Sequence, residues 1–465
     1  MKYVSTRGEA EILDFEGVTL AGLARDGGLY VPERIPTLDR DTIRGMAGKP
    51  YAEVASPVIK PFVGDTIPDA DLRAMLDETY GGSVFRHAAV APLVQLGAND
   101  WVLELFHGPT LAFKDFALQL LGRLFDYFTA KRGQKLTILG ATSGDTGSAA
   151  IEACRGRENV TIYMLHPKGR VSEVQRRQMT TVLEPNVINI AIDGTFDDCQ
   201  ALVKASFNDL AFRDRVGLTA VNSINWARVM AQIVYYFTSA TALGAPDRAV
   251  SYSVPTGNFG DIYAGFIARE MGLPIDKLVI ATNSNDILAR TLQTGSYSKG
   301  NVHATLSPSM DIQVSSNFER MMYDLSGRNG STIKDYMAGF AETGKITLSE
   351  NEIAQARSVF EAKQISDETT TGVMAELQQT TGYIADPHTA VGIEASKLLE
   401  AGGAPRVTLS TAHPVKFGDA VSGATGLTPD LPSHMADLYD REEGFAELEN
   451  DTAALQRLIL KGVGQ

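Results

Sequence analysis

The sequence predicts an α/β fold with a mostly parallel sheet. Short apolar runs alternate with helix-like segments from about residue 99 onward. Parallel strands need long crossover connections, usually helices, so this alternation is typical of such a sheet. The chain of 465 residues, 44% hydrophobic and 21% charged, is an ordinary globular composition with enough length for two or three domains.

Residues 1–95 lack this alternation and are expected to form a separate, helix-rich N-terminal domain of mixed α/β type. They are punctuated by turn-forming stretches such as DGGLYVPERIP at 26–36. The remaining region, 96–465, is expected to carry the chemistry, because it contains the strand–loop–helix units.

Six apolar runs are expected to be strands, each followed by a loop or helix: 135–141, 159–165, 186–192, 249–255, 277–283 and 405–411. Helices are expected after the first three, over 147–155, near 172–182 and over 197–207. A further amphipathic helix within 345–362 is opened by Ser349, with Glu352 three residues on, which is the pattern of a capping box. We expect this last helix to be structural only.

The stretch HGPTLAFKDFALQLLG, residues 107–122, predicts a buried helix with a lysine in its first turn. From Phe113 the apolar residues recur with the 3.6-residue period of a helix, and Thr110 is the expected N-cap. The helix dipole disfavours a cation at Lys114. The position suits an amine that must be neutral or bound to a carbonyl, although a solvated lysine paired with Asp115 is the alternative.

Charge and cysteine content limit the possible partners. The net charge of −14 argues against nucleic-acid and anionic-membrane partners, which favour a basic face. Cys154 and Cys199 form no CxxC pair and have no histidine cluster beside them, so no disulfide or metal site is expected. No apolar run of 18 residues occurs. We expect a soluble cytoplasmic protein.

The loop GATSGDTGSAA, residues 140–150, is a candidate site for a small anion. It lacks the lysine of a P-loop after Gly144 and does not match GxGxxG. Thr142, Ser143 and Thr146 instead place three hydroxyls before a helix N-terminus, which suits a carboxylate. A purely structural turn would explain the glycines and not the hydroxyls.

Two further loops predict phosphate sites. In PTGNFGD, residues 255–261, two glycines allow consecutive N–H groups to converge on one point. In NSINWAR, residues 222–228, Ser223 and Asn225 stand at a helix start, and Arg228 follows within the first turn. Arginine binds phosphate through two parallel hydrogen bonds. Two anion sites in an acidic protein indicate a phosphorylated cofactor and a phosphorylated substrate.

The fourth loop is STAHPVKF, residues 410–417, where Thr411 and His413 follow a strand end. A proline-containing turn with a capping threonine is the structural alternative.

Together, these motifs resemble those of the threonine synthase family, pyridoxal-phosphate enzymes of fold type II, the tryptophan-synthase-β class. The resemblance also includes SPSMDIQVSSNFER at 307–320 and DPHTAVG at 386–392, and it is similar to the enteric-bacterial and fungal branch. It implies two parallel-sheet subdomains, the smaller, at about 125–225, inserted in the larger, and a monomer or homodimer.

The resemblance also implies a role for each candidate residue. Lys114 would bind pyridoxal phosphate covalently. Gly257, Asn258, Phe259 and Gly260 would hold the cofactor phosphate. Thr411 would face the ring nitrogen, and Asp145 the 3′-oxygen, where many relatives have asparagine. Thr142, Ser143 and Thr146 would surround the substrate carboxylate, and Ser223, Asn225 and Arg228 the substrate phosphate.

The implied reaction converts O-phospho-L-homoserine and water into L-threonine and phosphate, with Lys114 as base and acid. Three alternatives remain open from the sequence. They are another fold-type II lyase such as a serine/threonine dehydratase, a non-catalytic binding relative, and a Rossmann dehydrogenase.

Overall fold

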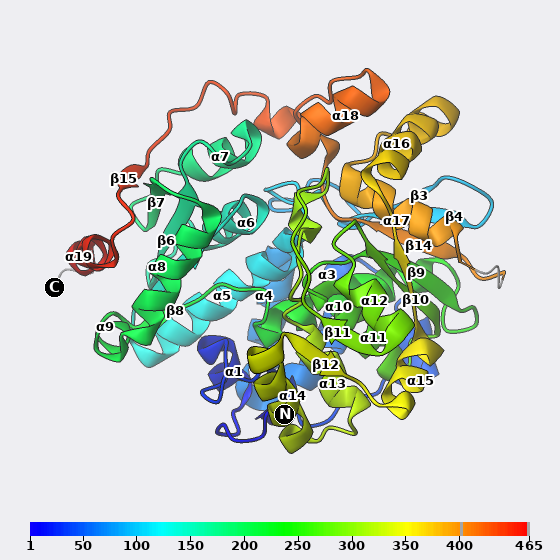
Figure 1. Ribbon diagram of the computed structural model, residues 1–465, viewed down its shortest axis with the longest axis horizontal. Coiled ribbons are helices and arrows are strands. Elements are labelled where there is room, and N and C mark those ends of the chain that lie inside the picture. The colour runs from blue at the N-terminus through cyan, green and yellow to red at the C-terminus, as the bar shows by residue number, and fades with distance from the viewer. Residues whose placement is uncertain (400–402, 463–465) are drawn as a thin grey trace. The chain divides into compact units, whose positions relative to one another are not determined.

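The structure is a computed structural model that describes residues 1–399 and 403–462. It contains two compact units (Figure 1). The first comprises Met1–Val18, Leu23–Phe113 and Ser223–Pro429, and the second comprises Thr19–Gly22, Lys114–Asn222 and Asp430–Gln465. Within the described residues, no helix has the length and apolar character needed to cross a membrane.

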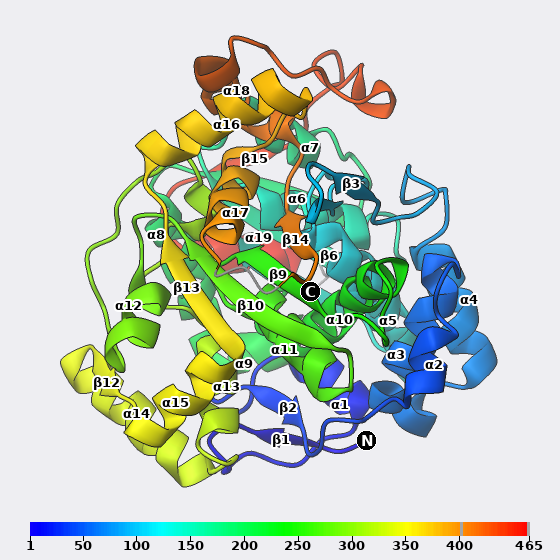
Figure 2. The ribbon, with the colours of Figure 1, turned by 90° about the vertical axis from the view of Figure 1, so that its right-hand side faces the viewer.

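The first unit contains a six-stranded sheet in the order β13-β10-β9-β14-β4-β3. Its strands are β13 (Phe360–Gln364), β10 (Ile275–Thr282), β9 (Val250–Pro255), β14 (Arg406–Ser410), β4 (Asp100–Glu104) and β3 (Leu93–Gln95). Every neighbouring pair is parallel except β3 with β4. Strands β13, β10 and β9 lie side by side in Figure 2. All residues of β9 are buried, as expected for a central parallel strand.

The second unit contains a parallel five-stranded sheet in the order β15-β7-β6-β5-β8. Its strands are β15 (Ala446–Leu448), β7 (Val187–Ile192), β6 (Val160–Pro167), β5 (Leu136–Ala141) and β8 (Leu218–Thr219). Apolar residues of the strands form one core with Leu455 and Ile459 of the C-terminal helix α19 (Thr452–Gly462).

The helices connect these strands. In the second unit they are α5 (Lys114–Arg132), α6 (Asp145–Cys154), α7 (Glu173–Thr180), α8 (Phe196–Asn208) and α9 (Leu210–Val216). In the first unit, those nearest the predicted site loops are α10 (Trp226–Ala242), α11 (Gly260–Glu270), α13 (Phe318–Leu325) and α17 (Pro387–Lys397). The others there include α2 (Arg40–Arg44), α3 (Tyr51–Val63), α4 (Asp69–Thr79), α12 (Ile287–Thr294), α14 (Gly330–Thr343), α15 (Glu350–Val359), α16 (Asp367–Thr381) and α18 (Gly418–Thr425). The residues of α1 (Phe15–Ala21) are divided between the two units.

All six predicted strands are confirmed, with ends within about two residues of those expected. The capping box at Ser349 and Glu352 is confirmed too. Strands β4 and β13 were not predicted from the sequence. In the sequence, the segment of β13 resembles a continuation of the preceding helix, because FEAKQ has only two apolar residues. Its strand geometry comes from pairing with β10.

The helix that carries Lys114 is confirmed, but the predicted N-cap at Thr110 is wrong. Helix α5 begins at Lys114 itself. Leu111 has a positive φ of 60°, which no helix accommodates. The preceding segment instead pairs with the loop after β14, through an antiparallel bridge between Ala112 and Ala412.

Residues 1–95, except Thr19–Gly22, belong to the same compact unit as the six-stranded sheet. The physical reason is a shared aromatic core: the ring of Trp226, on α10, packs against Tyr3 and Phe62. The second unit includes all of α5 and takes β15 and α19 from the C-terminal segment.

Candidate active site

Lys114 and Asp145 lie at the first positions of α5 and α6 and face each other. The Lys114 Nζ is 3.3 Å from the Asp145 Oδ2, and the two residues are 9% and 6% exposed. A cation at a helix N-terminus is disfavoured by the dipole, and a buried one requires a counter-charge. Asp145 supplies it. The ion pair therefore keeps the Lys114 amine buried, which is an environment that suits a reactive lysine.

The three hydroxyls of the 142–146 loop have different environments. The Thr142 hydroxyl accepts hydrogen bonds from the N–H groups of Gly144 and Gly147, both at 2.9 Å, and so shapes the start of α6. Ser143 is exposed and Thr146 is half-buried. Ser143 and Thr146 are therefore better candidates than Thr142 for direct contact with a carboxylate. The Thr142 hydroxyl instead fixes the conformation of the loop.

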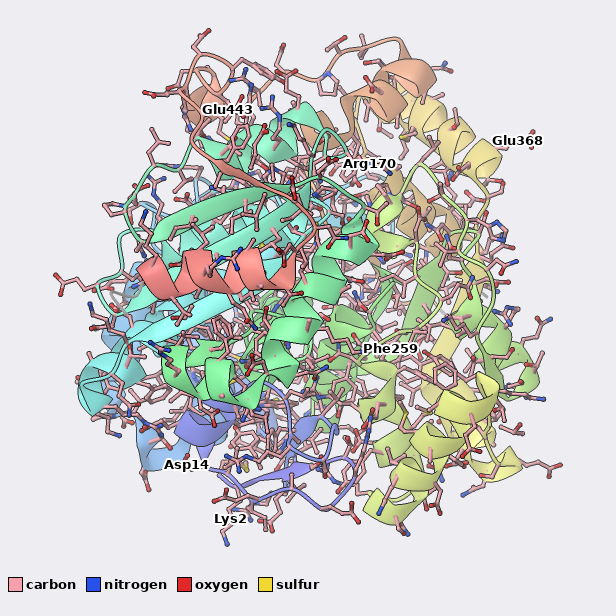
Figure 3. All side chains as sticks on the ribbon, turned by 60° about the vertical axis from the view of Figure 1, so that its left-hand side comes forward. Lys2, Asp14, Arg170, Phe259, Glu368 and Glu443 are labelled. Atoms are coloured by element: carbon pink, nitrogen blue, oxygen red, sulfur yellow. The ribbon has the colours of Figure 1, made fainter. Side chains whose placement is uncertain are left out.

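The loop after β9 presents a row of backbone donors. Among the described residues, none accepts a hydrogen bond from the N–H groups of Gly257, Asn258, Phe259 and Gly260. Phe259 (labelled in Figure 3) has a left-handed φ of 61° at the start of α11. Strained backbone of this kind is common in ligand-binding loops. Converging N–H groups at a helix N-terminus suit a phosphate.

Two residues of the 307–320 motif, to which no role was assigned from the sequence, hold the two predicted phosphate loops together. The Asn317 side chain donates to the carbonyls of Ser223, at 3.1 Å, and Asn258, at 2.9 Å. The Ser315 hydroxyl donates to the Gly257 carbonyl at 2.6 Å. A Cβ on Gly257 would lie 3.1 Å from the Ser309 carbonyl, so packing by itself favours a glycine there. The polar run SSN before a helix was the available signal.

The NSINWAR residues have three different environments in the same unit. The Asn225 side chain caps α10 by accepting from the Ala227 N–H at 3.0 Å. The Ser223 hydroxyl lies 3.2 Å from that of Ser316. Arg228 is 5% exposed, and its Nη1 has no hydrogen-bond partner in the described part of the chain. Burial lowers the pKa of Arg228 to about 10, which leaves the guanidinium charged at neutral pH.

Thr411 lies beside the segment that leads into Lys114. Its carbonyl accepts from the Phe113 N–H at 2.9 Å, and the Lys416 Nζ donates to the Thr110 carbonyl at 2.8 Å. Burial lowers the pKa of His413 to about 4, so this histidine is neutral near pH 7. Thr411 is itself buried, and its backbone is tied to Phe113 within the first unit.

Asp261, in the first turn of α11, leads to a stability prediction. Burial raises its pKa to about 6, although the hydroxyls of Tyr235 and Tyr236 donate to its Oδ1. The stability that this group contributes is complete below about pH 4 and is lost as the pH rises through 6. Asp261→Asn is therefore expected to raise the free energy of unfolding by about 2 kcal/mol at pH 8 and to change it little at pH 4. Urea unfolding at both pH values measures this, and an equal change at both would contradict it.

The predicted site residues fall into two sets, one in each compact unit. The second unit contains Lys114, Thr142, Ser143, Asp145 and Thr146; the first contains Ser223, Asn225, Arg228, Gly257, Asn258, Phe259, Gly260 and Thr411. In the second unit the structure joins Lys114 to Asp145, and in the first it joins the loops that begin at Ser223 and Gly257.

Three family models match the chain. Residues 2–80 match "Threonine synthase N terminus", residues 84–338 match "Pyridoxal-phosphate dependent enzyme", and residues 389–459 match "Threonine synthase, C-terminal". A threonine synthase of Pseudomonas aeruginosa is 56% identical over 461 residues, which are 99% of this chain and 98% of that one.

Solved structures agree. A threonine synthase from Brucella melitensis with bound pyridoxal phosphate has a TM-score of 0.98 and 53% identity, with 100% of both chains covered. The yeast threonine synthase has a TM-score of 0.94 and 38% identity, covering 100% of this chain and 99% of that one. A tomato threonine deaminase, 13% identical with a TM-score of 0.51 over 86% of this chain and 98% of its own, shares the fold alone.

Proposed function

The chain belongs to the threonine synthase family of pyridoxal-phosphate-dependent enzymes, and we propose that Lys114 is the residue that binds the cofactor and transfers protons in its reaction. The fold class predicted from the sequence, fold type II, is confirmed. The enzyme converts O-phospho-L-homoserine and water into L-threonine and phosphate. The family match therefore excludes the three alternatives, which were another fold-type II lyase such as a dehydratase, a non-catalytic relative and a Rossmann dehydrogenase.

The observation that carries the proposal is the buried Lys114 amine, 3.3 Å from Asp145 at the start of α5. Pyridoxal phosphate, when bound, supplies an electron sink for negative charge that develops beside the substrate amine. Lys114 would hold the cofactor through Nζ and move protons at neighbouring substrate carbons. The acceptor-free N–H groups of residues 257–260 suit the cofactor phosphate.

The other roles follow from the chemistry of the side chains. Thr411 would donate or accept a hydrogen bond at the ring nitrogen, and Asp145 would face the 3′-oxygen. Ser143 and Thr146, with Thr142 shaping their loop, would bind the substrate carboxylate. Ser223 and Arg228 would bind the substrate phosphate, and Asn225 caps the helix α10 that carries Arg228.

Borohydride reduction of the yellow enzyme tests the assignment of Lys114. The reduction is expected to fix the colour to one peptide that contains Lys114, and an inorganic-phosphate assay is expected to show release of phosphate from O-phospho-L-homoserine. Label at Lys131 or Lys135 would move the cofactor to another lysine. Absence of both colour and phosphate release would end the proposal.

Thr411→Val tests the partner of the ring nitrogen. Valine keeps the shape of threonine and removes its hydroxyl, so the loss is expected to cost about 0.5–1.5 kcal/mol of cofactor binding. The measurement is the cofactor dissociation constant together with the visible spectrum. A variant with the parent's spectrum, affinity and turnover would show that another group faces the ring.

We further propose that the enzyme works in the cytoplasm as a monomer or homodimer. Support for a reducing compartment comes from Cys154 and Cys199, which are both free and buried. Its substrate is a small molecule, and its acidic composition gives nucleic acid no general attraction.

A further inference from the structure

Gln175, on α7, contacts the oxygen of Asp145 that does not face the lysine. Its Nε2 donates to the Asp145 Oδ1 at 2.7 Å, and the Asp145 Oδ2 is the atom 3.3 Å from the Lys114 Nζ. The carboxylate is thus held between an amide on one side and an amine on the other. All three residues belong to the second compact unit.

The orientation of the Gln175 amide is set by its second partner. The Ser172 hydroxyl donates to the Gln175 Oε1 at 2.9 Å, and Ser172 is also the N-cap of α7. With its carbonyl oxygen occupied in this way, the amide presents its NH₂ group to Asp145. An ionised carboxylate can only accept, so this arrangement satisfies both groups and stabilises the charged form of Asp145.

The glycine-rich loop makes room for this side chain. A Cβ on Gly144 would lie 2.5 Å from the Gln175 amide carbon, too close for any real contact. Gly144 also has a φ of 150°, which disfavours other residues. The glycine before Asp145 is therefore explained by Gln175, which is itself only 7% exposed.

We propose that Gln175 is the positioning residue of the lysine site: it holds Asp145 ionised, with Oδ2 directed at Lys114, and so sets the pH at which the Lys114 nitrogen loses its proton. The inference rests on the proposed function, in which Lys114 binds the cofactor. It adds a residue that no motif of the sequence indicated. Gln175 acts through Asp145 and does not itself need to contact cofactor or substrate.

Charged residues also adjoin Lys114 and Gln175 along their own helices. On α5 the charged neighbour is the buried Asp115. On α7 the next two residues are occupied elsewhere: Arg176 pairs with Glu443 (labelled in Figure 3), and Arg177 pairs with Glu173 at 3.1 Å. The Gln175 amide donates to this carboxylate from α7.

The test is a pH titration of the visible absorption band of the yellow holoenzyme, which reports protonation of the nitrogen that joins Lys114 to the cofactor. Gln175→Met keeps the length and burial of the side chain and removes the donor. Without the donor, Asp145 takes up a proton at a higher pH and then no longer places a negative charge beside the lysine, so the midpoint is expected to fall by about one pH unit. Gln175→Glu is expected not to lower the midpoint, because its carboxyl donates when protonated and adds negative charge when ionised.

Gln178→Met is the matched control, since Gln178 is a second buried glutamine of α7 and its amide donates to the Met435 sulfur. Its midpoint is expected to stay with the parent's. Ser172→Ala, at an exposed cap, is expected to give a smaller fall than Gln175→Met and serves if the methionine variant does not fold. Equal midpoints for Gln175→Met and Gln178→Met would overturn the inference, provided that borohydride still labels Lys114. If Gln175→Met does not fold, an unchanged midpoint for Ser172→Ala would overturn it in the same way. Labelling at another lysine would instead overturn the proposed function.

Discussion

Lys114→Ala is expected to lower kcat on O-phospho-L-homoserine by about a hundredfold to ten-thousandfold. The variant loses the amine that binds the cofactor and the group that transfers protons, and positioned proton transfer alone accounts for an effect of that size. It also leaves Asp145, which is 6% exposed, without its counter-charge. Steady-state release of phosphate and the cofactor content of the purified variant measure both consequences.

Lys131→Ala is the matched control, because Lys131 lies in the last turn of the same helix and is exposed. It is expected to keep the parent's kcat, since a surface lysine at a helix end contributes only to local stability. A Lys114→Ala enzyme that retained a tenth or more of the parent's turnover, with the far-ultraviolet spectrum of a folded protein, would place the proton-transferring group elsewhere.

The local sequence pattern was sufficient to predict most strands of the two large sheets. The six predicted strands have consecutive apolar residues bounded by turn residues, and burial on both faces of a parallel sheet requires that pattern. Strand β13 was missed because its pairing with β10 depends on a contact more than 80 positions away along the chain. The strand preference of such a segment comes from its neighbours in the sheet, which a local pattern does not contain.

The same limit applies to the candidate site. The place of Lys114 at the start of a largely apolar helix was predictable from the local pattern, and its conflict there with the helix dipole is what predicts a role for it, which stays a proposal. The Thr110 cap was wrong because Leu111 takes a left-handed conformation that pairing with the loop after β14 imposes. Asn317 and Gln175 act through hydrogen bonds to residues 59 and 30 positions away in sequence, respectively. The residue type alone does not indicate which of the many amide side chains in the sequence makes such a distant contact.

The second large effect concerns Arg228. A buried guanidinium whose Nη1 lacks a partner among residues 1–399 and 403–462 lowers the stability of the folded protein. Its pKa of about 10, lowered by burial, still leaves it charged in the neutral range. A destabilising charge of this kind is typical of a binding site in which the counter-ion is the ligand. Here that ligand is proposed to be the substrate phosphate.

Arg228→Met is therefore expected to have opposite effects on stability and on catalysis. The melting temperature should rise, because the uncompensated charge is removed while volume and burial are kept. In contrast, kcat/KM on O-phospho-L-homoserine should fall about tenfold to a hundredfold, the equivalent of a charge-assisted hydrogen bond of roughly 1.5–3 kcal/mol. Because the same phosphate is the leaving group, the bond strengthens as charge develops on it, so kcat should fall as well.

Arg228→Lys separates charge from geometry. Lysine keeps the positive charge and loses the two parallel donors, so its kcat/KM is expected to lie between those of the parent and the methionine variant. Inhibition by inorganic phosphate should weaken in the same order, while cofactor content stays at the parent's level, because the 257–260 loop and Lys114 are unchanged. If both variants turn over phosphohomoserine like the parent, Arg228 is structural and the substrate phosphate binds elsewhere. A loss of cofactor in both would instead assign the arginine to the cofactor's own phosphate.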